Sequence, residues 1–232
     1  MTTIILVRHG QASFGSENYD RLSELGVRQS RLLGEHWARS GFAFDAVYTG
    51  DMARQRNTAH HALEALPHTA LPVRSQHWFN EYEFEAVMRA YLPQVAMEKP
   101  ELGLQHGGLY KNPRLFQTAF ELAIAKWLGE HPHAHAPFES WRDFCGRCVN
   151  GLREIAAAGH QRVVVFTSGG VIAVALREAL GLSDTMTFRQ NWRIYNASVH
   201  TFRSGRSGLS LLGFNNISHL ELGGAPDLVT FR

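Results

Sequence analysis

The tripeptide Arg8-His9-Gly10 combines residue types that bind and transfer phosphate, and it follows the apolar run at residues 4–7. Arginine has a planar fork that matches a phosphate group, histidine can act as a nucleophile or base, and glycine lets backbone N–H groups approach closely. This combination indicates phosphoryl transfer. The alternative for the tripeptide alone is a strand end with a surface arginine and a solvated histidine.

Two later segments add groups that bind anions. Arg54 lies in the first turn of an expected helix, where its side chain and the positive end of the helix dipole both attract an anion. Ser168, Gly169 and Gly170 follow an apolar strand and open a helix, so the glycine N–H groups form a second anion site. An exposed arginine is the alternative for Arg54. A nucleophilic serine is disfavoured at Ser168, because the G-x-S-x-G pattern requires a glycine where Phe166 stands.

The elements that position these residues alternate between strands and helices. Apolar runs predict strands at residues 4–7, 45–49, 72–74, 162–167, 197–203 and 209–214. Helical patterns and end signals predict helices at residues 23–39, 52–66, 141–158 and 171–180. This order, with a hairpin between the last two strands, predicts an α/β fold of three layers, α/β/α, around a mostly parallel sheet. Ligands bind such sheets at the carboxyl ends of the strands.

The bulk composition predicts a single domain over residues 1–232, with 44% hydrophobic residues to form its core. The segment at about residues 83–137 is helical in pattern but interrupted by proline and glycine, so we interpret it as an insertion. A net charge of +2 and scattered basic residues argue against a nucleic-acid or membrane partner. Since no apolar stretch approaches roughly 18 residues and no leader precedes the first strand, we expect a cytoplasmic protein.

Several metal or redox candidates have simpler explanations. Cys145 and Cys148 form a C-x-x-C pair inside a helical pattern, which favours two reduced helix cysteines over a thioredoxin-like site. The alternating histidines at 131, 133 and 135 have no carboxylate between them, so a solvated loop is favoured over a metal site. His219 is expected to be a structural histidine, with a place in the active site as the alternative. We expect no cofactor, and the sequence leaves the oligomeric state open.

The motifs together resemble those of the histidine phosphatase superfamily, also called phosphoglycerate-mutase-like proteins. The resemblance covers most of the chain in the family's order. The matching segments are Arg8-His9-Gly10-Gln11, Leu22-Ser23-Glu24-Leu25-Gly26 with Gln29, Asp51-Met52-Ala53-Arg54 through Thr58-Ala59, Glu81, and Thr167-Ser168-Gly169-Gly170.

This resemblance implies that His9 attacks phosphorus and becomes a phosphohistidine, which water then hydrolyses. Arg8 and Arg54 would bind the phosphate oxygens, with Ser168 and Gly169 beside them. Glu81 would donate a proton to the leaving oxygen. Acidic neighbours and nearby aromatic rings would raise the pKa of Glu81 if they lie close to it. The implied substrate is a small-molecule phosphate ester, and the scheme requires no metal.

Ser168 departs from the family's pattern, in which active members carry a second histidine that helps hold the phosphoryl group. A serine removes a charge-assisted hydrogen bond of about 1.5–3 kcal/mol. If that bond acts mainly in the transition state, the rate falls by about 100- to 1000-fold. We therefore expect a weak or substrate-restricted phosphomonoesterase. The alternative is a phosphate-binding or regulatory protein with little or no turnover.

A phosphoglycerate mutase fits this sequence less well than a phosphatase. Mutases of the family carry a Trp-Asn pair shortly after the first motif, whereas this chain has Ala12-Ser13-Phe14-Gly15.

Overall fold

The computed structural model describes residues 1–13, 20–66, 71–104, 112–129 and 138–231. The chain divides into two compact units, one formed by Met1–Glu81 with Arg147–Arg232 and the other by Tyr82–Gly146. The histidine tract at 131–135 lies outside the described residues. The prediction of a single domain with an insertion stays a prediction. Among the described residues, no helix is both long and apolar enough to cross a membrane.

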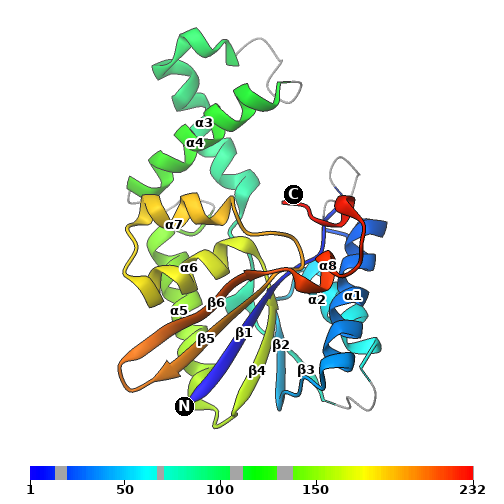
Figure 1. Ribbon diagram of the computed structural model, residues 1–232. Helices are drawn as coiled ribbons and strands as arrows, with labels where there is room; N and C mark the ends of the chain where they lie inside the picture. Colours follow the sequence, from blue (N-terminus) through cyan, green and yellow to red (C-terminus); the bar gives the residue numbers. More distant parts are fainter. Residues whose placement is uncertain (14–19, 67–70, 105–111, 130–137, 232) are drawn as a thin grey trace. The chain divides into compact units, whose positions relative to one another are not determined.

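The larger unit is built on a six-stranded sheet with the strand order β3-β2-β4-β1-β5-β6 (Figure 1). The first four strands in this order are parallel to one another, while β5 and β6 are antiparallel additions at one edge. The strand bounds are β1 Thr2–Arg8, β2 Ala46–Thr49, β3 Val73–Ser75, β4 Arg162–Thr167, β5 Val199–Gly205 and β6 Gly208–Asn216. The mostly parallel sheet is the one that the alternating pattern predicts.

Both faces of the central strands are buried, so their residues are apolar without alternation. On one face, Ile5, Val7 and Phe166 pack with side chains of helices α1 (Glu24–Ser40) and α2 (Ala53–Glu64). On the other face, Ile4 and Val165 are fully buried. Helix α6 (Gly169–Leu180) and the later part of α5 (Trp141–Ala157) lie on this side (Figure 1). The α/β prediction is confirmed.

The helix ends follow the local sequence signals. Ser23 is the N-cap of α1, and its side chain accepts from the N–H of Gly26 at 3.1 Å. Gly41 ends the same helix at φ 64°, in the left-handed region that glycine tolerates best. Helices α7 (Asp184–Asn191) and α8 (Ser218–Glu221) were not predicted, because both are short and α7 lacks a clear apolar stripe.

The smaller unit is helical. It holds α3 (Phe84–Glu98), the 3₁₀ helix Pro100–Leu102, α4 (Pro113–Gly129) and the first turns of α5. Its core is aromatic, with the Trp127 ring 4.9 Å from that of Tyr82 and 6.3 Å from that of Phe144. Cys145 lies in this unit and Cys148 in the other, and both are buried, reduced cysteines of α5, as the helical pattern indicates.

Candidate active site

Three parallel strands end at the same edge of the sheet and deliver the predicted residues there. Arg8 of β1 pairs with Thr167 of β4, and Thr49 of β2 pairs with Phe166. The residues that follow these strand ends are therefore neighbours in space. His9 is held against this edge by its backbone N–H, which donates to the Thr167 carbonyl at 2.9 Å.

His9 is buried, and its two ring nitrogens face different partners. Nδ1 lies 2.7 Å from the carbonyl oxygen of Gly10, which can only accept, so Nδ1 carries the ring proton. Nε2 keeps its lone pair and accepts from Nε of Arg54 at 3.3 Å. Burial, followed by the charges of Arg54 and Arg8, holds the pKa of His9 well below its usual value of 6.5. The imidazole is therefore neutral near pH 7, as a nitrogen nucleophile must be.

Gly10 fits only because it has no side chain. A Cβ at this position would lie 2.4 Å from the carbonyl oxygen of Gly26 in α1. The Gly10 N–H donates to Oγ1 of Thr58 in α2 at 3.0 Å. These contacts join the first motif to both helices, which explains why glycine stands directly after the histidine.

Arg54 begins α2 as predicted, and a carboxylate that the sequence analysis missed holds it in place. Asp20 accepts from Nη1 of Arg54 at 2.8 Å through Oδ1 and from the N–H of Ala53 at 2.7 Å through Oδ2. Asp20 therefore caps α2 and orients the buried guanidinium. The only signal for such a partner is at the helix start, where the Met52 side chain offers no oxygen to cap the free N–H groups.

Arg8 lies close to the start of α6, and one of its nitrogens binds the C-terminal segment. A Cβ on Gly169 would lie 3.8 Å from Nε of Arg8. Nη1 of Arg8 donates to the Ile194 carbonyl and, at 2.8 Å, to the Phe231 carbonyl. Arg8 thus connects the first motif to Ile194 and to Phe231.

Ser168 is fully buried at the N-cap of α6, yet its side chain makes no cap bond. Its Oγ instead accepts from Nε2 of Gln55 at 2.7 Å. Gln55 is also fully buried, and the same Nε2 donates to the Phe79 carbonyl at 2.9 Å. The sequence analysis missed Gln55, for which the only signal was a long amide directly after Arg54.

The side chain of Glu81 reaches the start of α6. Its Oε2 accepts from the N–H of Gly170 at 3.1 Å. In this structure the Gly170 N–H at the helix start is therefore occupied by the side chain of Glu81.

Arg147 of α5 holds the segment that leads to Glu81. Its guanidinium donates to four backbone carbonyls of this segment, at 2.9–3.5 Å. The acceptors are the carbonyl oxygens of His77, Trp78, Asn80 and Glu81. A buried or half-buried carbonyl without a donor is costly, so Arg147 fixes the path of this loop. The sequence analysis did not identify this arginine.

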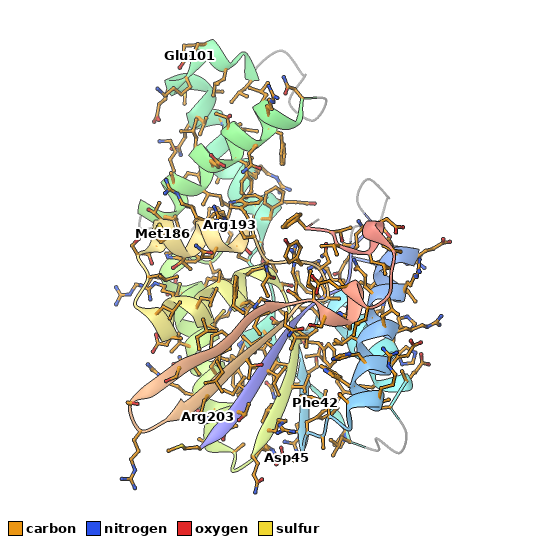
Figure 2. The ribbon with its side chains drawn as sticks, in the orientation of Figure 1. Phe42, Asp45, Glu101, Met186, Arg193 and Arg203 are labelled. Atoms are coloured by element: carbon orange, nitrogen blue, oxygen red, sulfur yellow. The ribbon has the colours of Figure 1, made fainter. Side chains whose placement is uncertain are left out.

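A cavity of about 690 Å³, open to solvent, lies beside Phe231, whose carbonyl accepts from Arg8. It is lined by Gln11, Trp192, Arg193, Thr230 and Phe231. Arg193, labelled in Figure 2, lies two residues after the end of α7 and is exposed, and no described carboxylate pairs with it. The cavity therefore offers aromatic surface and a positive charge next to Gln11, the last residue of the first motif.

Two other groups of histidines are not partners in the hydrogen bonds described above. His219 of α8 packs against His36 of α1 at 6.3 Å between ring centroids, and burial followed by His36 lowers its pKa to about 3. Among the described residues, one set of side chains has spacing that suits a metal ion. This set is His60, His61 and Glu64, on α2.

Comparisons with known proteins agree with this architecture. A family model described as the histidine phosphatase superfamily (branch 1) matches residues 4–107 and 111–217. A 2,3-bisphosphoglycerate-dependent phosphoglycerate mutase of Nitrobacter hamburgensis is 34% identical over 87 residues, which is 35% of this chain and 42% of the mutase. The chain thus matches less than half the length of that relative.

Solved structures share the fold over nearly the whole chain. A phosphoglycerate mutase of Bacillus anthracis has a TM-score of 0.67 at 20% identity and covers 97% of both chains. An α-ribazole phosphatase of Shigella flexneri has a TM-score of 0.63 at 16% identity, over 93% of this chain and 97% of its own. A phosphoserine phosphatase of Entamoeba histolytica has a TM-score of 0.62 at 18% identity, over 95% and 100%.

Proposed function

Since this chain belongs to the histidine phosphatase superfamily (branch 1), we propose that it hydrolyses phosphomonoesters through a phosphohistidine formed on His9. The observation that carries the proposal is the state of the His9 ring: buried, neutral, protonated on Nδ1, and with the Nε2 lone pair directed at an arginine. A phosphate drawn to Arg54 would meet that lone pair.

In the first step, Nε2 of His9 attacks phosphorus while the bond from phosphorus to the leaving oxygen breaks. Arg54 exchanges its bond to Nε2 for bonds to phosphate oxygens, and Arg8 contributes a second positive charge. Protonated Glu81 gives its proton to the leaving oxygen, which departs as an alcohol. The bond from Nδ1–H to the Gly10 carbonyl stabilises the positive charge that develops on the ring.

In the second step, water attacks the phosphohistidine. The Glu81 carboxylate takes a proton from this water, the N–P bond breaks, and inorganic phosphate leaves. His9 returns to its neutral form and Glu81 to its protonated form, so both are ready for another ester. No metal takes part in this scheme, because positive charge at phosphorus comes from the two arginines.

The cavity beside Phe231 supports a small-molecule substrate with an organic leaving group. Trp192 and Phe231 offer apolar contact, and Arg193 offers a positive charge. We propose that the leaving group carries a second acidic group, which Arg193 would bind.

A phosphate-binding protein with little turnover is the second candidate, and Ser168 favours it. A neutral hydroxyl stabilises a transferring phosphoryl group less than a charged imidazole would. The two candidates differ in turnover and agree in phosphate binding.

The test is rapid quenching of the protein with a radiolabelled aryl phosphate at mildly acidic pH without added metal. We expect acid-labile phosphate on the chain and release of inorganic phosphate, both lost in His9→Ala. His60→Ala, which removes an exposed histidine of α2, is the matched control. Phosphate binding by wild type with neither label nor release would favour the binding protein instead.

A further inference from the structure

We infer that Gln55 is a positioning residue that turns Ser168 into a hydrogen-bond donor to the transferring phosphoryl group. Two neutral, buried side chains, Gln55 and Ser168, would then together take the role of the second histidine in the family's pattern. The inference rests on the proposed phosphatase function and deepens it, because it assigns the step to a pair of residues.

The direction of the bond between these residues follows from their partners. The Phe79 carbonyl can only accept, so the side-chain nitrogen of Gln55 must face it. The second N–H of the same amide then donates to Ser168 Oγ. A hydroxyl that accepts in this way keeps its own proton to donate elsewhere.

The proton of Ser168 has no competing acceptor in the described part of the chain. Ser168 makes no cap bond to α6, and no described side chain or carbonyl accepts from its Oγ. A buried hydroxyl proton without an acceptor is costly until a ligand oxygen arrives. The start of α6, where this hydroxyl lies, also holds Glu81 through Gly170.

The first turn of α2 orients both His9 and Ser168. Arg54 donates to the His9 ring, and its neighbour Gln55 donates to Ser168. His9 and Ser168 are linked through the Thr167 carbonyl, which accepts from the His9 backbone. A phosphoryl group bound at Nε2 of His9 would therefore lie at the same edge of the sheet as the Ser168 hydroxyl.

The Gln55 amide is packed between Gly50 and Ser168, so we expect it to oppose a larger side chain at position 168. Gln55 Nε2 lies 2.7 Å from Ser168 Oγ, and a Cβ on Gly50 would lie 2.0 Å from Gln55 Oε1. A histidine ring at position 168 would overlap the Gln55 amide. We therefore expect S168H alone to lower turnover, and Q55A/S168H to exceed S168H.

The main test is a double-mutant cycle on the rate of phosphohistidine formation, with S168A, Q55M and the double variant. Both single changes remove the bond between Gln55 and Ser168 and with it the oriented donation from Ser168 to the phosphoryl group, so we expect each to lose about tenfold in this rate. Q55M also removes the bond to the Phe79 carbonyl. If the residues act together, the double variant also loses about tenfold. Independent action predicts about a hundredfold loss and would overturn the inference.

Further measurements separate a positioning role from a structural one. Thermal unfolding of each variant shows whether it is folded at the assay temperature. If Q55M is unfolded at that temperature, Q55E replaces it in the cycle. The carboxylate that Q55E introduces would accept a hydrogen bond from the Ser168 hydroxyl. This hydroxyl could then no longer donate to the phosphoryl group, so Q55E should match S168A in rate. A variant with the wild-type Km and a lowered kcat supports a role of the Gln55–Ser168 pair in the transition state. A variant that loses thermal stability but keeps the wild-type kcat opposes that role.

The same experiment distinguishes failure of the inference from failure of the proposed function. If wild type forms no label that depends on His9, the phosphatase proposal fails and this inference falls with it. If wild type is labelled and the losses are additive, the inference alone is wrong. A gain in turnover by S168H alone would also contradict it.

Discussion

Nε of Arg54 donates to Nε2 of His9 across 3.3 Å. The same guanidinium is bound to Asp20, so its position is set before any ligand arrives. This contact occupies the atom that would attack phosphorus, and it keeps a positive charge beside the ring. Arg54 can release the ring only when it gains other acceptors, such as phosphate oxygens.

The first prediction concerns the protonation of His9. Burial, then Arg54 and Arg8, lower its pKa well below 6.5, so the ring stays neutral through mildly acidic pH. Replacing Arg54 with methionine removes the second of these causes, and the pKa of His9 should rise toward 6.5. NMR titration of the imidazole nitrogens measures this directly.

The control for this titration is Arg56→Met, a change at an exposed arginine of the same helix. R56M should leave the pKa of His9 at its wild-type value. An identical His9 titration in R54M and wild type would show that burial alone sets the pKa, and the contact with Arg54 would lose its electrostatic role.

The strand and helix pattern could be predicted from the sequence because each central element has its own local signal. Strand β4, Arg162–Thr167, whose four inner residues are apolar, has the predicted bounds, and α1 begins at its predicted N-cap, Ser23. His9, Arg54 and Ser168 could be associated because parallel strand ends share an edge. These are properties of short segments and of sheet topology.

The supporting residues could not be predicted in the same way, because their partners are distant in the sequence. Arg147 is 66 to 70 positions from its acceptors, and Gln55 is 113 positions from Ser168. No period or cap signal reports such a contact. The cavity is a further case, since it joins the end of the first motif to Trp192 and the C-terminal Phe231.

The second prediction concerns the loop that carries Glu81. Glu81→Gln removes the proposed acid, and Arg147→Met removes the donor that fixes the loop. Both should slow hydrolysis of alkyl phosphates by about 100-fold, the usual scale of general acid catalysis. Both should have a much smaller effect on kcat/Km for p-nitrophenyl phosphate, because nitrophenolate leaves without a proton and kcat/Km reports only the steps through formation of the phosphohistidine, before Glu81 acts as a base.

Steady-state kinetics on the two esters provide the comparison. Arg142→Met, at an exposed arginine of the same helix, is the matched control and should not alter the ratio of the two rates. Equal losses on both esters in E81Q would contradict the role of Glu81 as acid. Equal losses in R147M alone would assign that arginine to folding rather than to positioning.

The third prediction concerns leaving-group selectivity at the cavity. Arg193 supplies an exposed positive charge there, so an ester with a carboxylate should be preferred over its neutral analogue. Arg193→Gln should reduce the ratio of kcat/Km for 4-carboxyphenyl phosphate over phenyl phosphate by about fivefold, on the scale of an exposed charge pair.

Arg189→Gln, in α7 and outside the cavity lining, is the control for this selectivity. It should keep the wild-type ratio. If the ratio is the same in wild type, R189Q and R193Q, the leaving group does not reach Arg193, and the proposed acidic leaving group is wrong.

The last prediction follows from buried histidines and concerns stability against pH. Burial lowers the pKa of both His200 and His219 to about 3, with smaller contributions from Arg8 and His36 respectively. The unfolded chain therefore binds more protons than the folded protein below the ordinary pKa of 6.5. The two histidines therefore leave the free energy of unfolding at its full value above pH 6.5, and they lower it progressively as the pH drops toward 3. Each histidine contributes a slope of about 1.4 kcal/mol per pH unit.

Urea denaturation between about pH 7 and pH 4.5 measures this slope. His219→Asn should lower the slope by the share of one histidine, whatever its effect on stability near pH 7. His60→Asn, at an exposed histidine of α2, should leave the slope as it is in wild type. An unchanged slope in H219N would mean that His219 takes up a proton in the folded protein, in which case its burial between α8 and α1 does not exclude the charged form.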